Sequence, residues 1–117
     1  MAGKSELGSW GEAIAARYLE RLGYEVRERN FRCPLGELDL VATEGAYIVF
    51  VEVKTRSEGQ SVHPALSVTA RKRAKVRQLG EYYCARHVEL PLQPRFDVIA
   101  VVAGPSGERV EHIVNAF

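Results

Sequence analysis

Residues 47–54 constrain the fold more than any other segment, because apolar side chains occupy both faces of a strand. The apolar positions are Tyr47, Val49, Val51 and Val53 on one face and Ile48 and Phe50 on the other. A strand with this pattern has to be covered on both sides. The segment therefore predicts an α/β domain of three layers, in which helices flank a mixed sheet of four to five strands.

Two segments have the apolar spacing of the covering helices. The first is residues 9–22, where Ser9 and Glu12 have the form of a capping box at the helix start. The second is expected over residues 68–87, with prolines beyond its end. Further strands are expected at residues 24–30, 38–42, 96–102 and 109–114, the first of them a half-exposed edge strand.

Length and composition limit the class of protein. The 117 residues suffice for one core and contain no repeat or linker, so we expect a single domain over residues 1–117. No apolar run approaches the ~20 residues of a membrane span, and residues 1–10 lack a signal peptide's apolar core, so a cytoplasmic location is expected. Cys33 and Cys84 have no zinc-ligand spacing and are expected to be reduced thiols.

Charge is distributed unevenly along a chain whose net charge is only +1. Residues 54–95 carry nine basic and three acidic side chains, whereas the segments on either side are acidic overall. Such a basic block predicts one positively charged face that meets an anionic partner, most commonly nucleic acid.

The strongest candidates for catalytic residues are Asp39, Glu52 and Lys54. They belong to adjacent strands of an expected hairpin, and Glu52 and Lys54 share a face at ~6.6 Å of rise. Two carboxylates suit a hard divalent cation such as Mg²⁺ or Mn²⁺, and a neighbouring lysine can orient or deprotonate a water molecule. Taken singly, these residues equally suit an ion pair at a strand end and a turn cap, but burial of such charges is unfavourable unless they are paired or bind metal.

Three motifs resemble the YraN family of bacterial proteins. They are GELDLVA at 36–42, FVEVKTR at 50–56 and RFDVIAV at 95–101, and the opening GEAIAARYLERLGYEVRERNFR and closing HIVNAF are similar to that family too. That family is similar to the PD-(D/E)XK nuclease superfamily, which includes archaeal Holliday junction resolvases. The resemblance implies a restriction endonuclease-like domain and, by analogy with resolvases, a possible homodimer.

The resemblance also implies roles for individual residues. Asp39 and Glu52 match the metal-binding acids, Lys54 matches the motif lysine, and Glu12 matches an acid that resolvases add from their first helix. Leu38 stands where the motif has a proline, a departure that many superfamily members share. Glu12 equally suits the capping box, and Glu37 is a candidate for supporting the metal ligands.

Basic residues of the second helix are the candidate nucleic-acid contacts, notably Arg71, Lys72 and Lys75, of which Lys72 matches the family pattern. They lie in the first half of the helix, where the macrodipole opposes positive charge, although a charge run is more often a solvated face. Arg56 is placed to hold a phosphate beside the metal. His63 is a candidate substrate contact in a loop at residues 57–64.

Asp97 suits a structural role, as the partner of Arg95 in a buried ion pair that ties two strands. For the chain as a whole, we expect divalent-metal-dependent hydrolysis of nucleic-acid phosphodiesters, in structured or branched DNA rather than RNA. A nucleic-acid-binding module that does not cut is the alternative, and a purely structural ion-pair network is the third.

Overall fold

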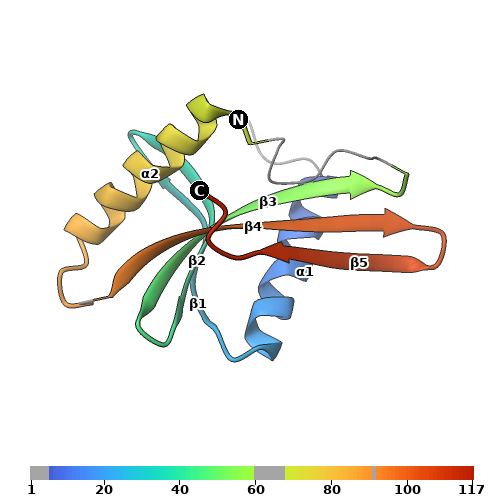
Figure 1. Ribbon diagram of the computed structural model, residues 1–117, viewed down its shortest axis with the longest axis horizontal. Coiled ribbons are helices and arrows are strands. Elements are labelled where there is room, and N and C mark those ends of the chain that lie inside the picture. The colour runs from blue at the N-terminus through green and yellow to red at the C-terminus, as the bar shows by residue number, and fades with distance from the viewer. Residues whose placement is uncertain (1–5, 60–67, 91) are drawn as a thin grey trace.

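The computed structural model describes residues 6–59, 68–90 and 92–117 (Figure 1). They form one five-stranded mixed sheet with a helix on each face, which confirms the expected three-layer α/β arrangement. The elements are α1 (Glu6–Arg21), β1 (Glu25–Cys33), β2 (Gly36–Glu44), β3 (Tyr47–Ser57), α2 (Ala70–Ala85), β4 (Gln93–Gly104) and β5 (Gly107–Ile113). The strands follow their chain order across the sheet, and β3 with β4 is the parallel pair.

Strand β3 is covered on both faces, as its apolar pattern predicts. Val49 and Val51 pack under α1 in one buried cluster, while Ile48 and Phe50 pack under α2 in another. Tyr47 is an exception, because at the open start of the strand its side chain is 37% exposed. Strand β1 lies at the edge of the sheet and is half-exposed, also as expected.

Helix α1 begins three residues before the position that the capping box indicated. It starts at Glu6, so Ser9 lies inside the helix and the capping-box interpretation of Ser9 and Glu12 is wrong. A Ser-x-x-Glu pattern signals a cap only where the preceding turn is not helical. The helix sits directly on β3, since a Cβ added at Gly11 would lie 2.5 Å from Thr55 Oγ1.

Helix α2 is shorter than expected at both ends. Thr69 caps it by accepting a hydrogen bond from the Lys72 N–H at 3.1 Å, and the helix ends at Ala85, before the prolines. Its buried residues are Val76, Leu79, Gly80 and Tyr83, whereas Ala70, Ala74 and Ala85 are exposed. The close approach at Gly80, where an added Cβ would lie 3.0 Å from Phe96, fixes the helix against the sheet.

The sheet opens between β2 and β3. Their pairing runs from Glu44 and Tyr47 to Leu40 and Val51 and then stops. Beyond that point β2 continues to pair with β1, while β3 continues along β4 as far as Ser57. We call this region without pairing, between Gly36–Asp39 of β2 and Glu52–Ser57 of β3, the notch.

No helix in the described part of the chain is both long and apolar enough to cross a membrane.

Candidate metal centre and nucleic-acid interface

Asp39 stands at the point where β2 and β3 separate. Its side chain is buried, with 7% of the residue exposed, and its Oδ2 accepts a hydrogen bond from the Val53 N–H at 2.8 Å. The carboxylate thus takes the place that a backbone carbonyl of β2 would have in a continued ladder. It is held against the residue that follows Glu52, which brings the two expected acids to the same part of the notch.

Glu52 and Lys54 point from β3 toward the α2 side, where Phe50 of the same strand face is packed. Lys54 Nζ lies 3.7 Å from Glu52 Oε2, so these two side chains are neighbours, as their spacing predicts. The same oxygen also lies 3.6 Å from Lys72 Nζ, which reaches it from α2. Two ammonium groups, one from β3 and one from α2, therefore lie beside the Glu52 carboxylate.

Burial makes the negative charge of Glu52 unfavourable. Glu52 is 7% exposed, and an ionised carboxylate at that depth is strongly disfavoured unless cations or hydrogen-bond donors compensate it. The two lysines are the cations, but their side chains are 27% and 44% exposed. Solvent screens such partly exposed ammonium groups, so each ion pair contributes only modestly to stability.

Glu12 reaches the sheet from the opposite face. It is 4% exposed on α1, next to Gly11, which contacts Thr55 of β3. Since the capping role is excluded, Glu12 is a buried acid close to the end of β3 that carries Lys54. Across residues 6–59, 68–90 and 92–117, however, no three His, Cys, Asp or Glu side chains are gathered as a set able to hold a metal ion.

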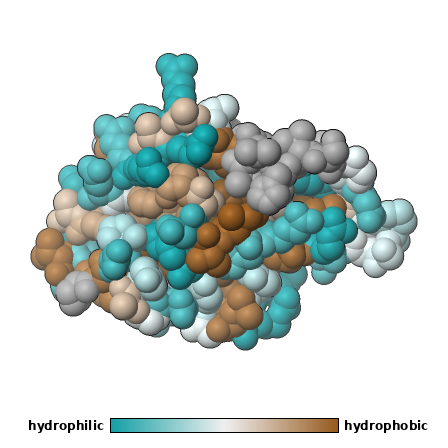
Figure 2. Space-filling view, in the orientation of Figure 1, coloured by the Kyte–Doolittle hydropathy of each residue, from teal (hydrophilic) through white to brown (hydrophobic). Residues whose placement is uncertain are grey.

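The expected basic residues point in different directions in the structure. Arg71 and Lys75 are exposed on α2, where Figure 2 shows hydrophilic residues interspersed with apolar ones, whereas Lys72 turns toward Glu52. Arg56 is on the same face of β3 as Glu52 and Lys54 by strand alternation. Its Nε and Nη2 are buried and have no hydrogen-bond partner among the residues that the structure describes.

Arg73 belongs to the same basic run of α2 but differs from Arg71 and Lys75 in its direction. Its Nε is also buried without a hydrogen-bond partner in the described part of the chain. Arg73 lies seven residues before Gly80, a residue of the inner face of α2, so two helical turns place it on that same face. This periodicity separates Arg73 from the outward Arg71 and Lys75, and it was available in the sequence.

Two further candidates have other surroundings. Glu37 accepts a hydrogen bond from Arg32 Nε at 2.7 Å, across the β1–β2 hairpin where the two residues are register partners. This contact gives it a role in the hairpin. His63 and residues 60–64 of the expected loop lie outside the described residues.

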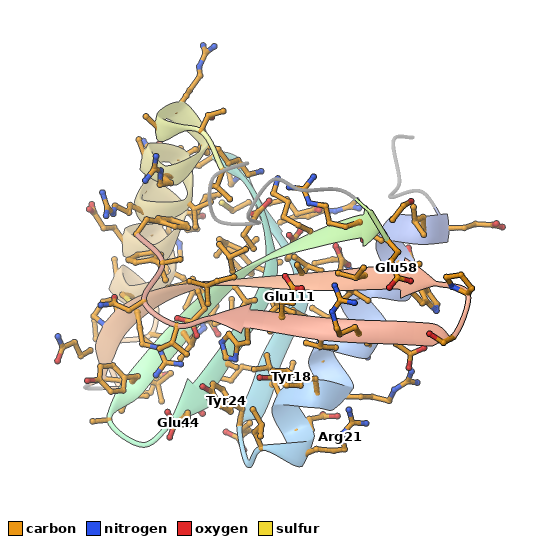
Figure 3. The ribbon with its side chains drawn as sticks, turned by 45° about the vertical axis from the view of Figure 1, so that its right-hand side comes forward. Tyr18, Arg21, Tyr24, Glu44, Glu58 and Glu111 are labelled. Carbon is orange, nitrogen blue, oxygen red and sulfur yellow. The ribbon has the colours of Figure 1, made fainter. Side chains whose placement is uncertain are left out.

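Asp97 belongs to a separate network on the α1 side of the sheet. Arg95 donates to it from Nε and Nη2 at 3.0 and 2.8 Å, which confirms the expected ion pair, and His112 Nε2 lies 2.8 Å away. Both Arg95 and Asp97 belong to β4, so the pair alone does not tie two strands. Tyr24 and Glu44, which receive further Arg95 contacts, and His112 provide the connections between elements (Figure 3).

Asp97 is fully buried and ionised. Burial alone would raise the pKa of its carboxyl, but hydrogen bonds from His112, Arg95 and the Asn115 N–H together hold the pKa below the usual range. The Asn115 N–H donates at 2.9 Å and so holds the segment after β5 against β4. These contacts make Asp97 part of the scaffold.

The two cysteines belong neither to the Glu52 ion pairs nor to the Asp97 network. Cys33 and Cys84 are free and half-buried, and burial raises the pKa of the Cys84 thiol.

Comparison with known proteins identifies close relatives over nearly the whole chain. The model of Uncharacterised protein family UPF0102 matches residues 11–101. A UPF0102 protein of Beutenbergia cavernae is 48% identical over 97% of this chain and 97% of its own length. UPF0102 proteins of Geobacter metallireducens and Caldanaerobacter subterraneus are 46% and 44% identical, over 95% and 97% of this chain and 91% and 96% of their own lengths.

Proposed function

The chain belongs to the uncharacterised family UPF0102, the YraN-like family that its motifs indicated, and within it we propose that the protein is a divalent-metal-dependent endonuclease. In this proposal the three layers are a restriction endonuclease-like domain, which works on cytoplasmic nucleic acid, and structured or branched DNA is the substrate. A homodimer would present two notches to a two-fold junction.

One observation carries the proposal. Two buried carboxylates, Asp39 and Glu52, lie at the point where two strands separate, and a lysine ammonium lies 3.7 Å from Glu52. Asp39 is held by the Val53 N–H, and Glu52 lies beside two partly exposed lysines, one of them from the basic helix α2.

The donor set fits magnesium or manganese. Mg²⁺ retains several water molecules and is commonly held by one or two carboxylates together with substrate phosphates, so Asp39 and Glu52 suffice and a third acid is not required. When bound, such an ion supplies Lewis acidity at the scissile phosphate and an activated water molecule. Glu12, buried on the α1 side, is proposed to tune or complete this metal shell.

The remaining residues bind the substrate and orient the attacking water. Lys54, whose ammonium group lies beside Glu52, would orient the attacking water and stabilise negative charge on the phosphate oxygens. Arg56, from the same face of β3, is proposed to hold a phosphate next to the site. Lys72, Arg71 and Lys75 extend the positive surface along α2 and bind the nucleic-acid backbone at positions that carry no sequence information.

A cleavage assay tests this function. Linear, nicked, single-stranded and four-way-junction DNA are incubated with the protein in Mg²⁺, Mn²⁺ or EDTA. We expect metal-dependent cutting that Glu52→Gln and Lys54→Gln abolish and that Glu81→Gln, an exposed acid on α2, leaves intact. Cutting that persists in EDTA or in both site variants would refute the proposal.

A binding module that does not cut is the second candidate. It is favoured by the lack of a three-ligand metal group within the described residues, and by Glu52 already being paired with two lysines. This candidate predicts salt-sensitive binding that Lys72→Ala weakens, with no cutting under any metal condition.

A further inference from the structure

Lys72 is the unusual member of the Glu52 cluster, because it comes from a different element. Lys54 is two residues from Glu52 on β3 and stays near it by strand geometry. Lys72 reaches the same oxygen from α2 at 3.6 Å, and its side chain is the more exposed of the two lysines, at 44% against 27%. The contact therefore joins α2 to the acid that we propose as a metal ligand.

The first turn of α2 has the wrong charge for a helix start. It contains Arg71, Lys72 and Arg73 and has no acidic side chain. The positive end of the helix dipole disfavours cations at this position. The Thr69 cap nevertheless fixes Lys72 there, by binding its backbone N–H at 3.1 Å. An ammonium group so placed is stabilised by a nearby anion, and Glu52 is that anion here.

We propose that Lys72 occupies the cation position at Glu52 until a divalent ion binds, and that the ion then releases Lys72 to a nucleic-acid phosphate. This exchange rests on the proposed metal-dependent function and adds its regulation. A divalent ion near Glu52 attracts the carboxylate more strongly than one ammonium does and repels Lys72. The released side chain then needs another anion at the helix start.

The consequence is reciprocal coupling between the two ligands. Metal binding makes Lys72 available to nucleic acid, and nucleic acid that holds Lys72 removes a competitor of the metal. Linkage requires each ligand to strengthen the binding of the other by the same factor. The protein would thus hold nucleic acid most tightly when the metal is in place.

The first test measures Mn²⁺ binding without nucleic acid, by calorimetry on the full chain. Lys72→Gln removes the competing charge and should tighten Mn²⁺ binding about two- to fivefold. Lys72→Arg keeps the charge and should bind Mn²⁺ like the wild type. Arg77→Gln, at an exposed basic position on the same helix, is the matched control for lost charge. An affinity for Mn²⁺ that is unchanged or weaker in Lys72→Gln would overturn the exchange.

The second test measures the binding of a DNA duplex with and without Mn²⁺. Wild type and Arg77→Gln should show the same strengthening by Mn²⁺, and Lys72→Gln should show a smaller one. Equal strengthening in all three proteins would overturn the coupling.

The two proposals fail in different ways. If Mn²⁺ binds as predicted but no DNA is cut, the exchange stands and the endonuclease is wrong. If Asp39→Asn and Glu52→Gln bind Mn²⁺ as the wild type does, the metal site and the exchange are both wrong.

Discussion

Among the residues that the structure describes, the buried acids Asp97 and Glu52 lie in surroundings that differ in kind. Asp97 receives four hydrogen bonds at 2.8 to 3.0 Å, from Arg95, His112 and a backbone N–H. Glu52 instead lies 3.6 and 3.7 Å from the ammonium groups of two partly exposed lysines. Arg95, His112 and a backbone N–H hold both oxygens of Asp97, whereas the lysines beside Glu52 are partly exposed to solvent and can be displaced by a cation.

The segments beside each acid reinforce this difference. Asp97 lies just past the last residue pair of β4 and β5, where His112 and the Asn115 N–H of the following segment contact it. Glu52 is just past the last residue pair of β2 and β3, at the edge of the notch. We therefore expect removal of Asp97 to affect folding and removal of Glu52 to affect ligand binding.

The largest expected effect is on stability at Asp97. Asp97→Ala would leave Arg95 buried without its carboxylate, and we expect a loss of about 3–5 kcal/mol in unfolding free energy. Urea denaturation followed by circular dichroism measures this loss. Glu81→Gln is the exposed control, and a loss at Asp97 below about 1 kcal/mol would contradict the structural role.

The next effect is stabilisation by metal. At a Mn²⁺ concentration 100 times its dissociation constant, a ligand that binds only the folded state adds about 2.7 kcal/mol. The melting temperature of the wild type should therefore rise with Mn²⁺, and that of Asp39→Asn and Glu52→Gln should not. Equal shifts in all three proteins would place the metal elsewhere.

The pH dependence of stability tests whether Asp97 is ionised in the folded protein. Its pKa is lowered by folding, from a usual value of 3.8, so its contribution is fully present above that value and is lost as the pH falls through the folded-state pKa. The difference in unfolding free energy between wild type and Asp97→Asn should shrink below about pH 4. A difference that stays constant down to about pH 2 would argue against an ionised Asp97.

The smallest effects concern the outward face of α2. Arg71→Gln and Lys75→Gln should leave stability within about 0.5 kcal/mol of wild type. Each should reduce the slope of DNA affinity against salt concentration by about one unit if the side chain contacts a phosphate. Filter binding at several salt concentrations measures the slope, and slopes equal to wild type would exclude this face from the interface.

The main features of the fold were predictable because they depend on local pattern. Alternation placed Glu52 and Lys54 on one face of β3, and apolar residues on both faces of that strand required two covering layers. The position of α1 was predicted less well, because the Ser-x-x-Glu pattern lies inside the helix and resembles a cap that the chain does not use.

The features that were not predicted depend on contacts between distant segments. Nothing in the local sequence says that β2 and β3 stop pairing after Leu40 and Val51, yet this separation creates the notch. The approach of Lys72 to Glu52 depends on how α2 packs against β3, which no spacing along the chain encodes. The inward direction of Arg73 could have been derived, from its distance of seven residues to Gly80.

The central claim is that Asp39 and Glu52 form a divalent-cation site, and crystals grown with Mn²⁺ test it most directly. Anomalous scattering from manganese would locate the ion without reference to any assay. We expect a peak within coordination distance of both carboxylates, with the Lys72 ammonium moved away from Glu52. Crystals with Mn²⁺ bound only elsewhere, and with Lys72 still paired to Glu52, would contradict it.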